Sequence, residues 1–435
     1  MRVPAALARA KLPAALLEVL RRLGGAGHRS WIVGGAVRDL LMHRPRAASD
    51  FDVATPATPR EVTALFPKVV PTGVEHGTVT VLAGGLAIEV TTFRGEGPYV
   101  DGRRPESVTF HRDLEADLAR RDFTMNALAW DPLASEFRDP HAGRADMARR
   151  IVRAVGVAEE RFAEDGLRPV RAVRFAAQLG YALAPATRRA IPAALPVVRK
   201  VAIERISEEL SRLVVAADAA RGIALARATG LLEVLLPALA RVPPPALDHA
   251  AKILSRVPPD LTLRFAALLH VLPAADAERT LVELRQPRRI SDEVAVLLRG
   301  HACRVATPAE SLPRSSAEVR RLLSRTGAQR ADALLALANA EAAALPTLRS
   351  RPARAEVKIL QREIAQVRRA RSPLAAQDLA LDGRAAMRAL AIGPGPEIGE
   401  ALRHLLDRVL EDPAMNAPDA LEAELRRWWA ERARR

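Results

Sequence analysis

The sequence contains very little cysteine and no long uncharged apolar run. Its one cysteine among 435 residues, Cys303, excludes an internal disulfide framework and a cysteine-based zinc site. A membrane-spanning helix needs about 20 consecutive apolar residues, and the sequence contains no such run. Arg9 and Lys11 interrupt the apolar residues near the N-terminus, which favours an amphipathic helix over a signal peptide. We therefore expect a cytoplasmic protein with no membrane association.

Lysine is also scarce, although the chain is strongly basic. The formal net charge is +15, and only five of the 66 basic residues are lysines. An excess of positive charge favours a polyanionic partner, because neutralising phosphates releases counterions. Abundant arginine, alanine and proline are equally expected from compositional bias across a genome. Charge alone therefore leaves nucleic-acid binding open.

The pattern of apolar residues along the chain changes near residue 145. Before it, short apolar runs such as 78–82 and 86–90 are bounded by glycine, which predicts strands joined in a hairpin. After it, apolar residues recur at helical spacing, and proline-rich breaks, including Pro346 and Pro352, interrupt the pattern. We predict an α+β protein with a mixed sheet in its first part and only helices in the remainder.

The segment from Ile32 to Leu41 predicts a strand, a glycine turn and the start of a helix. Gly34 and Gly35 would let a phosphate approach the backbone, and a helix N-terminus offers free N–H groups to an anion. Arg38, one turn into this helix, could reach the same phosphate. A glycine pair before a helix is also a common tight turn, so the motif by itself does not distinguish the two.

Asp50 and Asp52 follow this turn, separated by one residue. On a strand, residues two apart point to the same face, so their carboxylates would lie side by side. Mg²⁺ binds through one or two carboxylates together with substrate phosphates. An isolated pair of this kind is often a polar strand edge, but the glycine turn upstream favours a Mg²⁺ site with both aspartates as catalytic ligands. The alternation of side chains along the strand 86–90 leaves the role of Glu89 open: it is either a third carboxylate of the site or a solvent-facing residue.

These two segments together resemble the first motif of the polymerase-β-like nucleotidyltransferases. Within that group they are similar to the bacterial family of tRNA nucleotidyltransferases and poly(A) polymerases, the class II CCA-adding enzymes. Three later segments resemble the family's further motifs in the same order: 120–127, 139–146 and 161–176. The resemblance implies that Arg121 and Asp122 contact the sugar and phosphates of the nucleotide.

The segment 161–176 resembles the motif with which the family selects bases. Spacing by three would align Asp165, Arg168, Arg171 and Arg174 on one stripe of a helix. A solvated arginine face has this spacing too, but it does not explain the Asp-x-x-Arg pair. A carboxylate accepts hydrogen bonds and a guanidinium donates them, so Asp165 and Arg168 could match the edge of cytosine or adenine. Arg171 and Arg174 would then meet phosphates.

One departure from the family's pattern lies inside this motif. Members commonly have proline directly after the Glu-Asp pair, whereas this chain has Gly166 there and Pro169 three residues later. Because proline is tolerated only in the first turn of a helix, we predict that the helix begins later than usual. The position of Asp165 relative to Arg168 depends on where this helix begins.

Two further segments distinguish members of the family. Residues 72–81 contain a His-Gly-Thr-Val sequence that resembles the tRNA enzymes rather than the poly(A) polymerases. Residues 99–106 resemble the loop implicated in switching to ATP, which implies adenosine addition and leaves cytidine addition open. We therefore expect addition of CCA, or of its terminal A, to tRNA from CTP and ATP. A poly(A) polymerase is the alternative, and an inactive RNA-binding protein is a third hypothesis.

The resemblance also implies a division of the chain. The expected parts are a catalytic head at 1–145, a base-selecting neck at 146–215, a body at 216–345 and a tRNA-binding tail at 346–435.

Within the body, two histidines resemble those of a histidine-aspartate phosphohydrolase segment. They are His249 and His270, and Val271 stands where the motif has its aspartate. Because that site needs the His-Asp pair for its metal, we expect a helical scaffold whose metal site is lost.

Overall fold

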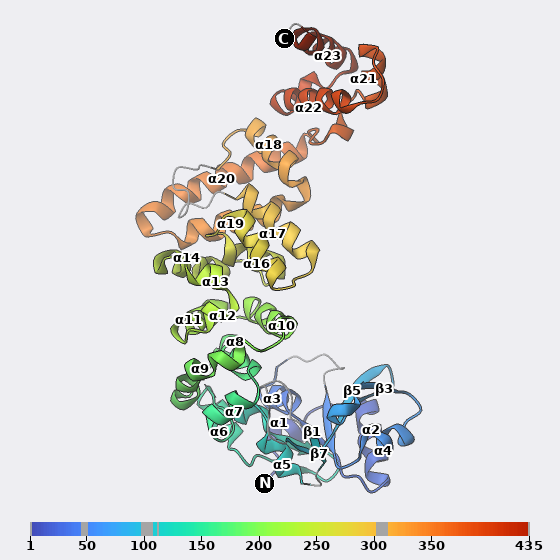
Figure 1. The fold of residues 1–435 in the computed structure, drawn as a ribbon, viewed down its shortest axis with the longest axis vertical. Coiled ribbons are helices and arrows are strands. Elements are labelled where there is room, and N and C mark those ends of the chain that lie inside the picture. The colour runs from blue at the N-terminus through green and yellow to red at the C-terminus, as the bar shows by residue number, and fades with distance from the viewer. Residues whose placement is uncertain (1, 45–50, 97–107, 111–112, 302–311, 434–435) are drawn as a thin grey trace. The chain divides into compact units, whose positions relative to one another are not determined.

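The computed structural model describes residues 2–44, 51–96, 108–110, 113–301 and 312–433. They form two compact units, Met1–Pro237 and Ala238–Arg435, which are described separately (Figure 1). Within the described ranges, no helix is both long enough and apolar enough to cross a membrane.

A seven-stranded mixed sheet belongs to the first unit. Its strands are β1 (Trp31–Val33), β2 (Asp52–Thr55), β3 (Val69–Gly73), β4 (Thr78–Ala83), β5 (Leu86–Thr92), β8 (Ala129–Asp131) and β9 (Glu136–Arg138). The order is β3-β4-β5-β2-β1-β8-β9, in which β2 and β5 are parallel and the other neighbours antiparallel. A separate pair joins β6 (Arg94–Glu96) to β7 (Val108–Phe110). The predicted hairpin is confirmed, with Gly84 and Gly85 at positive φ between β4 and β5.

Different parts of the chain cover the two faces of the large sheet. On one face, α2 (Ala14–Gly25) shares a core cluster with Val53 of β2. On the other face, Ala54 belongs to a second cluster to which α5 (Leu114–Ala119) contributes. Because side chains alternate along a strand, Asp52 points to the same face as Ala54. The alternation thus directs this carboxylate away from α2.

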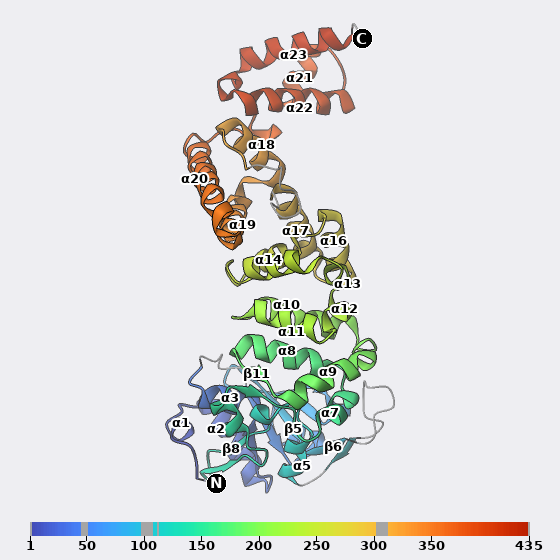
Figure 2. The same ribbon diagram turned by 90° about the vertical axis from the view of Figure 1, so that its left-hand side faces the viewer.

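Helices make up most of the remainder of the first unit. They are α1 (Ala5–Ala8), α3 (Gly35–Leu41), α4 (Pro59–Leu65), α6 (Gly143–Ala148), α7 (Ala158–Glu164), α8 (Leu167–Leu179), α9 (Pro185–Val198), α10 (Ile203–Val214), α11 (Ala219–Ala228) and α12 (Leu231–Leu235). Figure 2 shows α8 beside α10 and α11, which pack against it. Two short strands, β10 (Ile151–Val152) and β11 (Ala182–Leu183), also pair in parallel. The prediction of helices alone after residue 145 is therefore wrong in this detail.

The second unit has helices and no strands among its described residues. After α13 (Pro237–Ala240) at the boundary, its helices are α14 (Pro244–Leu254), α15 (Leu261–Leu269), α16 (Ala274–Glu283), α17 (Arg288–Gly300), α18 (Ser316–Thr326), α19 (Ala331–Ala344), α20 (Thr347–Arg369), α21 (Gly383–Leu390), α22 (Pro396–Glu411) and α23 (Pro418–Ala433). Pro346 directly precedes α20, as a break should, but Pro352 lies inside α20 and does not end it. The last three helices share a core cluster of their own around Leu405 and Leu421.

Candidate active site

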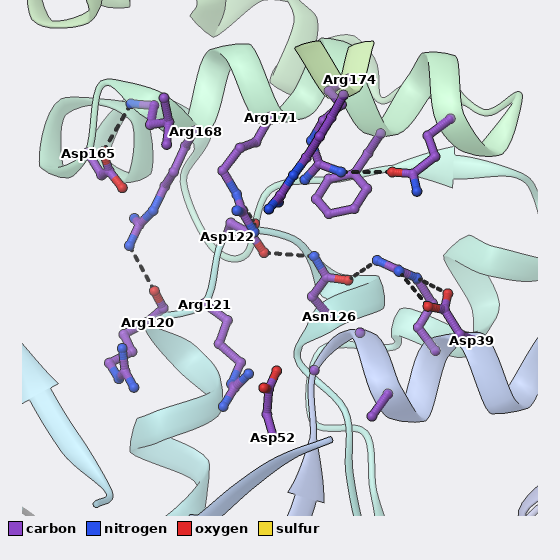
Figure 3. A pocket seen from close by; sticks show the side chains of 18 of the residues that line it. Asp39, Asp52, Arg120, Arg121, Asp122, Asn126, Asp165, Arg168, Arg171 and Arg174 are labelled. Atoms are coloured by element: carbon purple, nitrogen blue, oxygen red, sulfur yellow. Dashed lines mark hydrogen bonds and ion pairs between the residues drawn. The ribbon is translucent and has the colours of Figure 1, made fainter. Parts of the chain in front are cut away.

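A pocket of about 550 Å³ opens in the first unit (Figure 3). Its lining comes from the turn before α3, from β2, from the segment after α5, and from α8 and α10. The described residues that the sequence predicted for the site all line it: Gly35, Arg38, Asp52, Arg121, Asp122, Asp165, Arg168, Arg171 and Arg174. Asp50, the other predicted metal ligand, lies outside the described residues.

Asp52 lies beside the glycine turn that precedes α3. Gly34 has φ +70°, and a Cβ there would lie 3.0 Å from Nη1 of Arg121 and 3.6 Å from Oδ2 of Asp52. A residue with a side chain would be strained at this φ and would crowd both groups. Buried Asp117 holds Arg121, with 3.1 Å between its Oδ2 and the arginine Nη2. The turn thus lets a carboxylate and a guanidinium approach the same stretch of backbone, as Figure 3 shows.

Glu89 is the cross-strand neighbour of Asp52. The two residues are in register on the parallel strands β5 and β2. Since neighbouring strands lie about 5 Å apart, their carboxylates project side by side. Partial desolvation and the Asp52 carboxylate raise the pKa of Glu89, although much of its side chain is exposed. The strand register therefore places Glu89 on the Asp52 side of the sheet.

A chain of hydrogen bonds connects α3 to α8 across the pocket (Figure 3). Arg38 donates from Nε to Asp39 at 2.8 Å and from Nη1 to Oδ1 of Asn126 at 2.7 Å. Asn126 donates in turn to Asp122 Oδ1 at 3.0 Å, and Arg171 Nε donates to Asp122 Oδ2 at 2.8 Å. Although burial acts in the opposite direction, Arg171 and Asn126 hold the pKa of Asp122 below its usual range. The network fixes both arginines and keeps Asp122 ionised.

Glu209 of α10 forms ion pairs with two arginines of α8, Arg171 and Arg174. Its carboxylate pairs with Nε of Arg174 and lies 3.4 Å from Nη1 of Arg171. Arg174 also donates to Gln178 at 2.7 Å, and its guanidinium carbon lies 3.8 Å from the ring centroid of Phe175. Asp122 and Glu209 raise the pKa of Arg171 against the effect of burial. These contacts hold both guanidinium groups in place where they line the pocket.

We expect Glu209→Gln to lower the free energy of unfolding by about 3 kcal/mol, because breaking a buried ion pair leaves uncompensated charge. The Glu209 and Arg174 side chains are only 5% and 6% exposed. Urea denaturation followed by circular dichroism measures the loss. Glu208→Gln is the matched control, since Glu208 pairs with Arg212 on the exposed side of the same helix, and a change within about 0.5 kcal/mol is expected. Equal losses in both variants would contradict this account of Glu209.

Asp165 does not lie on the same helix as the three arginines, so the predicted four-residue stripe is wrong at its first position. Asp165 has an extended backbone after α7, and α8 begins at Leu167. Its Oδ1 accepts from the Leu167 N–H at 3.0 Å, and its Oδ2 lies 3.3 Å from Nη2 of Arg205. Arg168 donates to the carbonyl oxygens of Arg161 and Arg120, both at 2.9 Å. Both Asp165 and Arg168 nevertheless line the pocket.

Gly166 lies where the start of α8 closely approaches the end of α9. A Cβ at this position would lie 2.6 Å from the carbonyl oxygen of Val197 and 2.9 Å from Cγ2 of Val201. Because Val197 lies in α9, any residue other than glycine would push the end of α9 away from the start of α8. α8 begins at Leu167, so Pro169 falls in its first turn, where proline is tolerated.

Several residues of the site were not singled out from the sequence. Asn126 lies within a recognised motif, but its bridging role depends on the fold. Glu209 was detectable, because it occupies a helical position on the same face as Ile206, Leu210 and Leu213, where a charged side chain needs a buried partner. The partner itself comes from another helix and could not be identified from spacing.

Comparisons with known proteins show what this chain is similar to. The profile of the "Poly A polymerase head domain" family matches residues 30–153, and that of the "Probable RNA and SrmB- binding site of polymerase A" family matches residues 180–242. The CCA-adding enzyme of Geobacillus stearothermophilus is 42% identical over 315 residues, which cover 72% of this chain and 75% of the relative. The enzyme of the same name from Lactobacillus delbrueckii subsp. bulgaricus is 48% identical over 217 residues, 50% of this chain and 54% of the relative. The crystal structure of the Bacillus stearothermophilus CCA-adding enzyme in complex with CTP matches with a TM-score of 0.76 and 33% identity, covering 97% of this chain and 98% of that one.

Proposed function

Because this chain belongs to the family of CCA-adding enzymes, we propose that it adds C, C and A to the 3′ end of tRNA. The substrates are CTP and ATP, and pyrophosphate is released. The observation that carries the proposal is the convergence of Asp52, the glycine turn and the arginines of α8 on one pocket. A poly(A) polymerase is not favoured, since relatives at 42% and 48% identity are CCA-adding enzymes.

The reaction in this family uses a divalent metal, and we assign Mg²⁺ to Asp52, Glu89 and Asp50. Mg²⁺ prefers oxygen ligands, and Asp52 and Glu89 are in-register carboxylates on neighbouring strands. The raised pKa of Glu89 fits this role, because two adjacent carboxylates repel one another without a cation. When bound, Mg²⁺ would activate the attacking 3′-hydroxyl group and stabilise the leaving pyrophosphate. Asp50 is assigned from its spacing alone.

We expect Glu89→Gln to raise the melting temperature at pH 7 when metal is absent. Because folding raises the pKa of this carboxyl, its ionisation destabilises the folded state. The loss of stability begins as the pH rises above the pKa in the unfolded chain and is complete above the pKa in the folded protein. A neutral amide at this position removes the unfavourable charge. Mg²⁺ should then stabilise the variant less than the unaltered protein. Thermal denaturation with chelator and with Mg²⁺ measures both effects, and exposed Glu75 supplies the control variant Glu75→Gln. A lower melting temperature with an unchanged Mg²⁺ effect would exclude Glu89 as a ligand.

The arginines of the pocket would hold the triphosphate. Nine arginines and four aspartates line the pocket, and this excess of positive charge suits a highly anionic ligand. Arg121 lies closest to the glycine turn and Asp52, so its guanidinium would meet a phosphate near the metal. Arg171 and Arg174 are oriented by Asp122 and Glu209, which preorganises their remaining N–H groups for phosphate oxygens. Rigid placement reduces the entropy lost when the nucleotide binds.

Asp165 and Arg168 would choose the base. A carboxylate acceptor and a guanidinium donor complement the amino group and adjacent ring nitrogen of cytosine, and those of adenine. Uracil and guanine present a carbonyl oxygen in place of the amino group. Each mismatched buried polar group costs about 1–3 kcal/mol, so two failed contacts give strong discrimination without a template. The backbone bonds of Arg168 to Arg161 and Arg120 would keep its guanidinium in place.

The tRNA would lie along the basic helical part of the chain. The matched RNA-binding family covers residues 180–242, and the net charge of +15 favours phosphate contacts. An A-form stem is recognised mainly by shape and backbone contacts, which arginine side chains can supply. The head at 1–145, neck at 146–215, body at 216–345 and tail at 346–435 stay predictions, as does a cytoplasmic location.

A tRNA that ends before CCA, incubated with each nucleotide separately, tests whether the enzyme adds all three residues. We expect CTP alone to extend it by two nucleotides, and CTP with ATP by three. An enzyme that adds only the terminal A would leave this tRNA unextended with CTP, and it would add A only to a tRNA that already ends in CC.

A further inference from the structure

Four buried titratable side chains meet in the second unit, far from the pocket in sequence. They are His249 of α14, His270 and His301 directly after α15 and α17, and Glu341 of α19. In this order, the four residues are 7%, 3%, 8% and 1% exposed. Nucleotide addition as described above uses none of them. Buried charge in such a place needs a partner or a bound ion.

The cluster has the geometry of a ligand set. One potential ligand atom each from His249, His270 and Glu341 lies within 4.8 Å of the other two. His249 Nε2 is 3.7 Å from Oε1 of Glu341, and His301 Nε2 is 2.8 Å from its Oε2. The ring centroid of His270 lies 5.5 Å from that of His249 and 5.8 Å from that of His301. Three imidazoles thus surround one carboxylate.

The ring nitrogens of these histidines are buried, and two of the histidines have an Nε2 atom without a hydrogen-bond partner. His270 Nδ1 lies 2.8 Å from the carbonyl oxygen of Ala267, which requires a proton on Nδ1 and leaves Nε2 as an acceptor. The Nε2 atoms of all three histidines are buried; that of His301 faces Oε2 of Glu341 at 2.8 Å, whereas those of His249 and His270 have no hydrogen-bond partner. Unsatisfied buried acceptors are rare in folded proteins and call for an explanation.

We propose that His249, His270 and Glu341 bind one divalent transition-metal ion of the zinc type, which cross-links α14, α15 and α19. Two imidazole nitrogens and one carboxylate oxygen suit Zn²⁺ and disfavour Mg²⁺, which prefers oxygen ligands alone. His301 holds the second oxygen of Glu341 and orients the carboxylate. All four side chains are buried, which fits a structural ion better than one exposed to substrate. In this proposal the carboxylate missing at Val271 comes instead from Glu341.

The test uses the full chain with its purification tag removed and its metals stripped by a chelator. Zn²⁺ is titrated by calorimetry in excess Mg²⁺, so that the oxygen ligands around Asp52 are occupied. We expect one equivalent of Zn²⁺ to bind and to raise the melting temperature. His270→Gln should weaken this binding by more than about 100-fold. His404→Gln is the control, because His404 pairs with Glu424 at 2.9 Å elsewhere in the same unit, and it should bind Zn²⁺ normally.

Two results would overturn the proposal: no tight Zn²⁺ uptake by the unaltered chain, or unchanged uptake by His270→Gln. If that variant does not fold, Co²⁺ bound to the unaltered chain provides a second measurement. We expect intense visible absorption bands of a low-coordinate site and imidazole scattering in X-ray absorption spectra. A purely octahedral oxygen environment would exclude the histidine site. None of these measurements depends on nucleotide addition, so their failure leaves the proposed activity untouched.

Discussion

Asp52→Asn is expected to lower kcat for nucleotide addition by about 10³-fold, the loss of several kcal/mol of transition-state stabilisation. The substitution keeps the shape of the side chain but removes the negative charge that would hold the metal beside Gly34 and Arg121. Because the arginines of α8 are held by other carboxylates, CTP binding should change little. Single-turnover extension of tRNA measures the rate, and calorimetry measures CTP affinity.

The control for this variant is Asp113→Asn. Asp113 is exposed and caps α5 in the same unit by accepting from the Glu115 N–H. Asparagine caps a helix as well as aspartate does. The activity of Asp113→Asn should therefore equal that of the unaltered enzyme. Retention of activity by Asp52→Asn, with Asp113→Asn as reference, would refute the assigned role of Asp52.

Asp165→Ala is expected to reduce the preference for CTP over UTP by about 100-fold, measured as the ratio of kcat/KM values. Removing the carboxylate takes away the acceptor for the cytosine amino group, and one or two lost polar contacts at 1–3 kcal/mol each account for a change of about this size. The loss should fall mainly on CTP, because UTP gains nothing from the carboxylate. The fold should tolerate the change, since the ion-pair partner Arg205 is 42% exposed.

Glu160→Ala is the matched control, as Glu160 lies exposed on the preceding helix α7. It should leave the preference unchanged. If Asp165→Ala lowers activity with CTP and UTP equally, Asp165 positions the helix rather than reading the base. That outcome would follow if its bond to the Leu167 N–H were its main contribution.

The local elements of the head followed from its sequence because their signals are local. Glycine pairs mark turns whatever the rest of the chain does, so the hairpin of β4 and β5 was predictable from Gly84 and Gly85. Alternation also accounts for Phe51 and Val53, on either side of Asp52, which both belong to the core. Alternation could not decide the role of Glu89, because that depends on the parallel pairing of two strands more than 30 residues apart.

The candidate site was predictable as a set of residues but not as a set of contacts. The residues selected from the sequence line one pocket, whereas the partners that orient them come from distant elements. Glu209 lies 35 residues from Arg174, and spacing cannot identify such a pair. Asp165 was misassigned to α8 because spacing by three does not show where a helix begins, and its carboxylate in fact accepts from the Leu167 N–H at the start of α8.

The same limit applies to the second unit. His249 and His270 were noticed as a pair that lacks its aspartate, and the loss of a metal site followed from the local motif. Glu341 lies about 70 residues beyond His270 and reaches the cluster from α19. Only the fold brings these side chains together, so the sequence could exclude the familiar motif but not a different ligand set.

The proposed reaction of this pocket is the addition of a defined sequence to tRNA without a template. Its most direct test is to incubate the enzyme with all four nucleoside triphosphates, and either a tRNA lacking CCA or an unrelated RNA, and to sequence the 3′ ends. We predict that the tRNA gains CCA and that extension then stops, while the unrelated RNA gains almost nothing. Long runs of A on both RNAs would contradict this proposal and would identify a poly(A) polymerase.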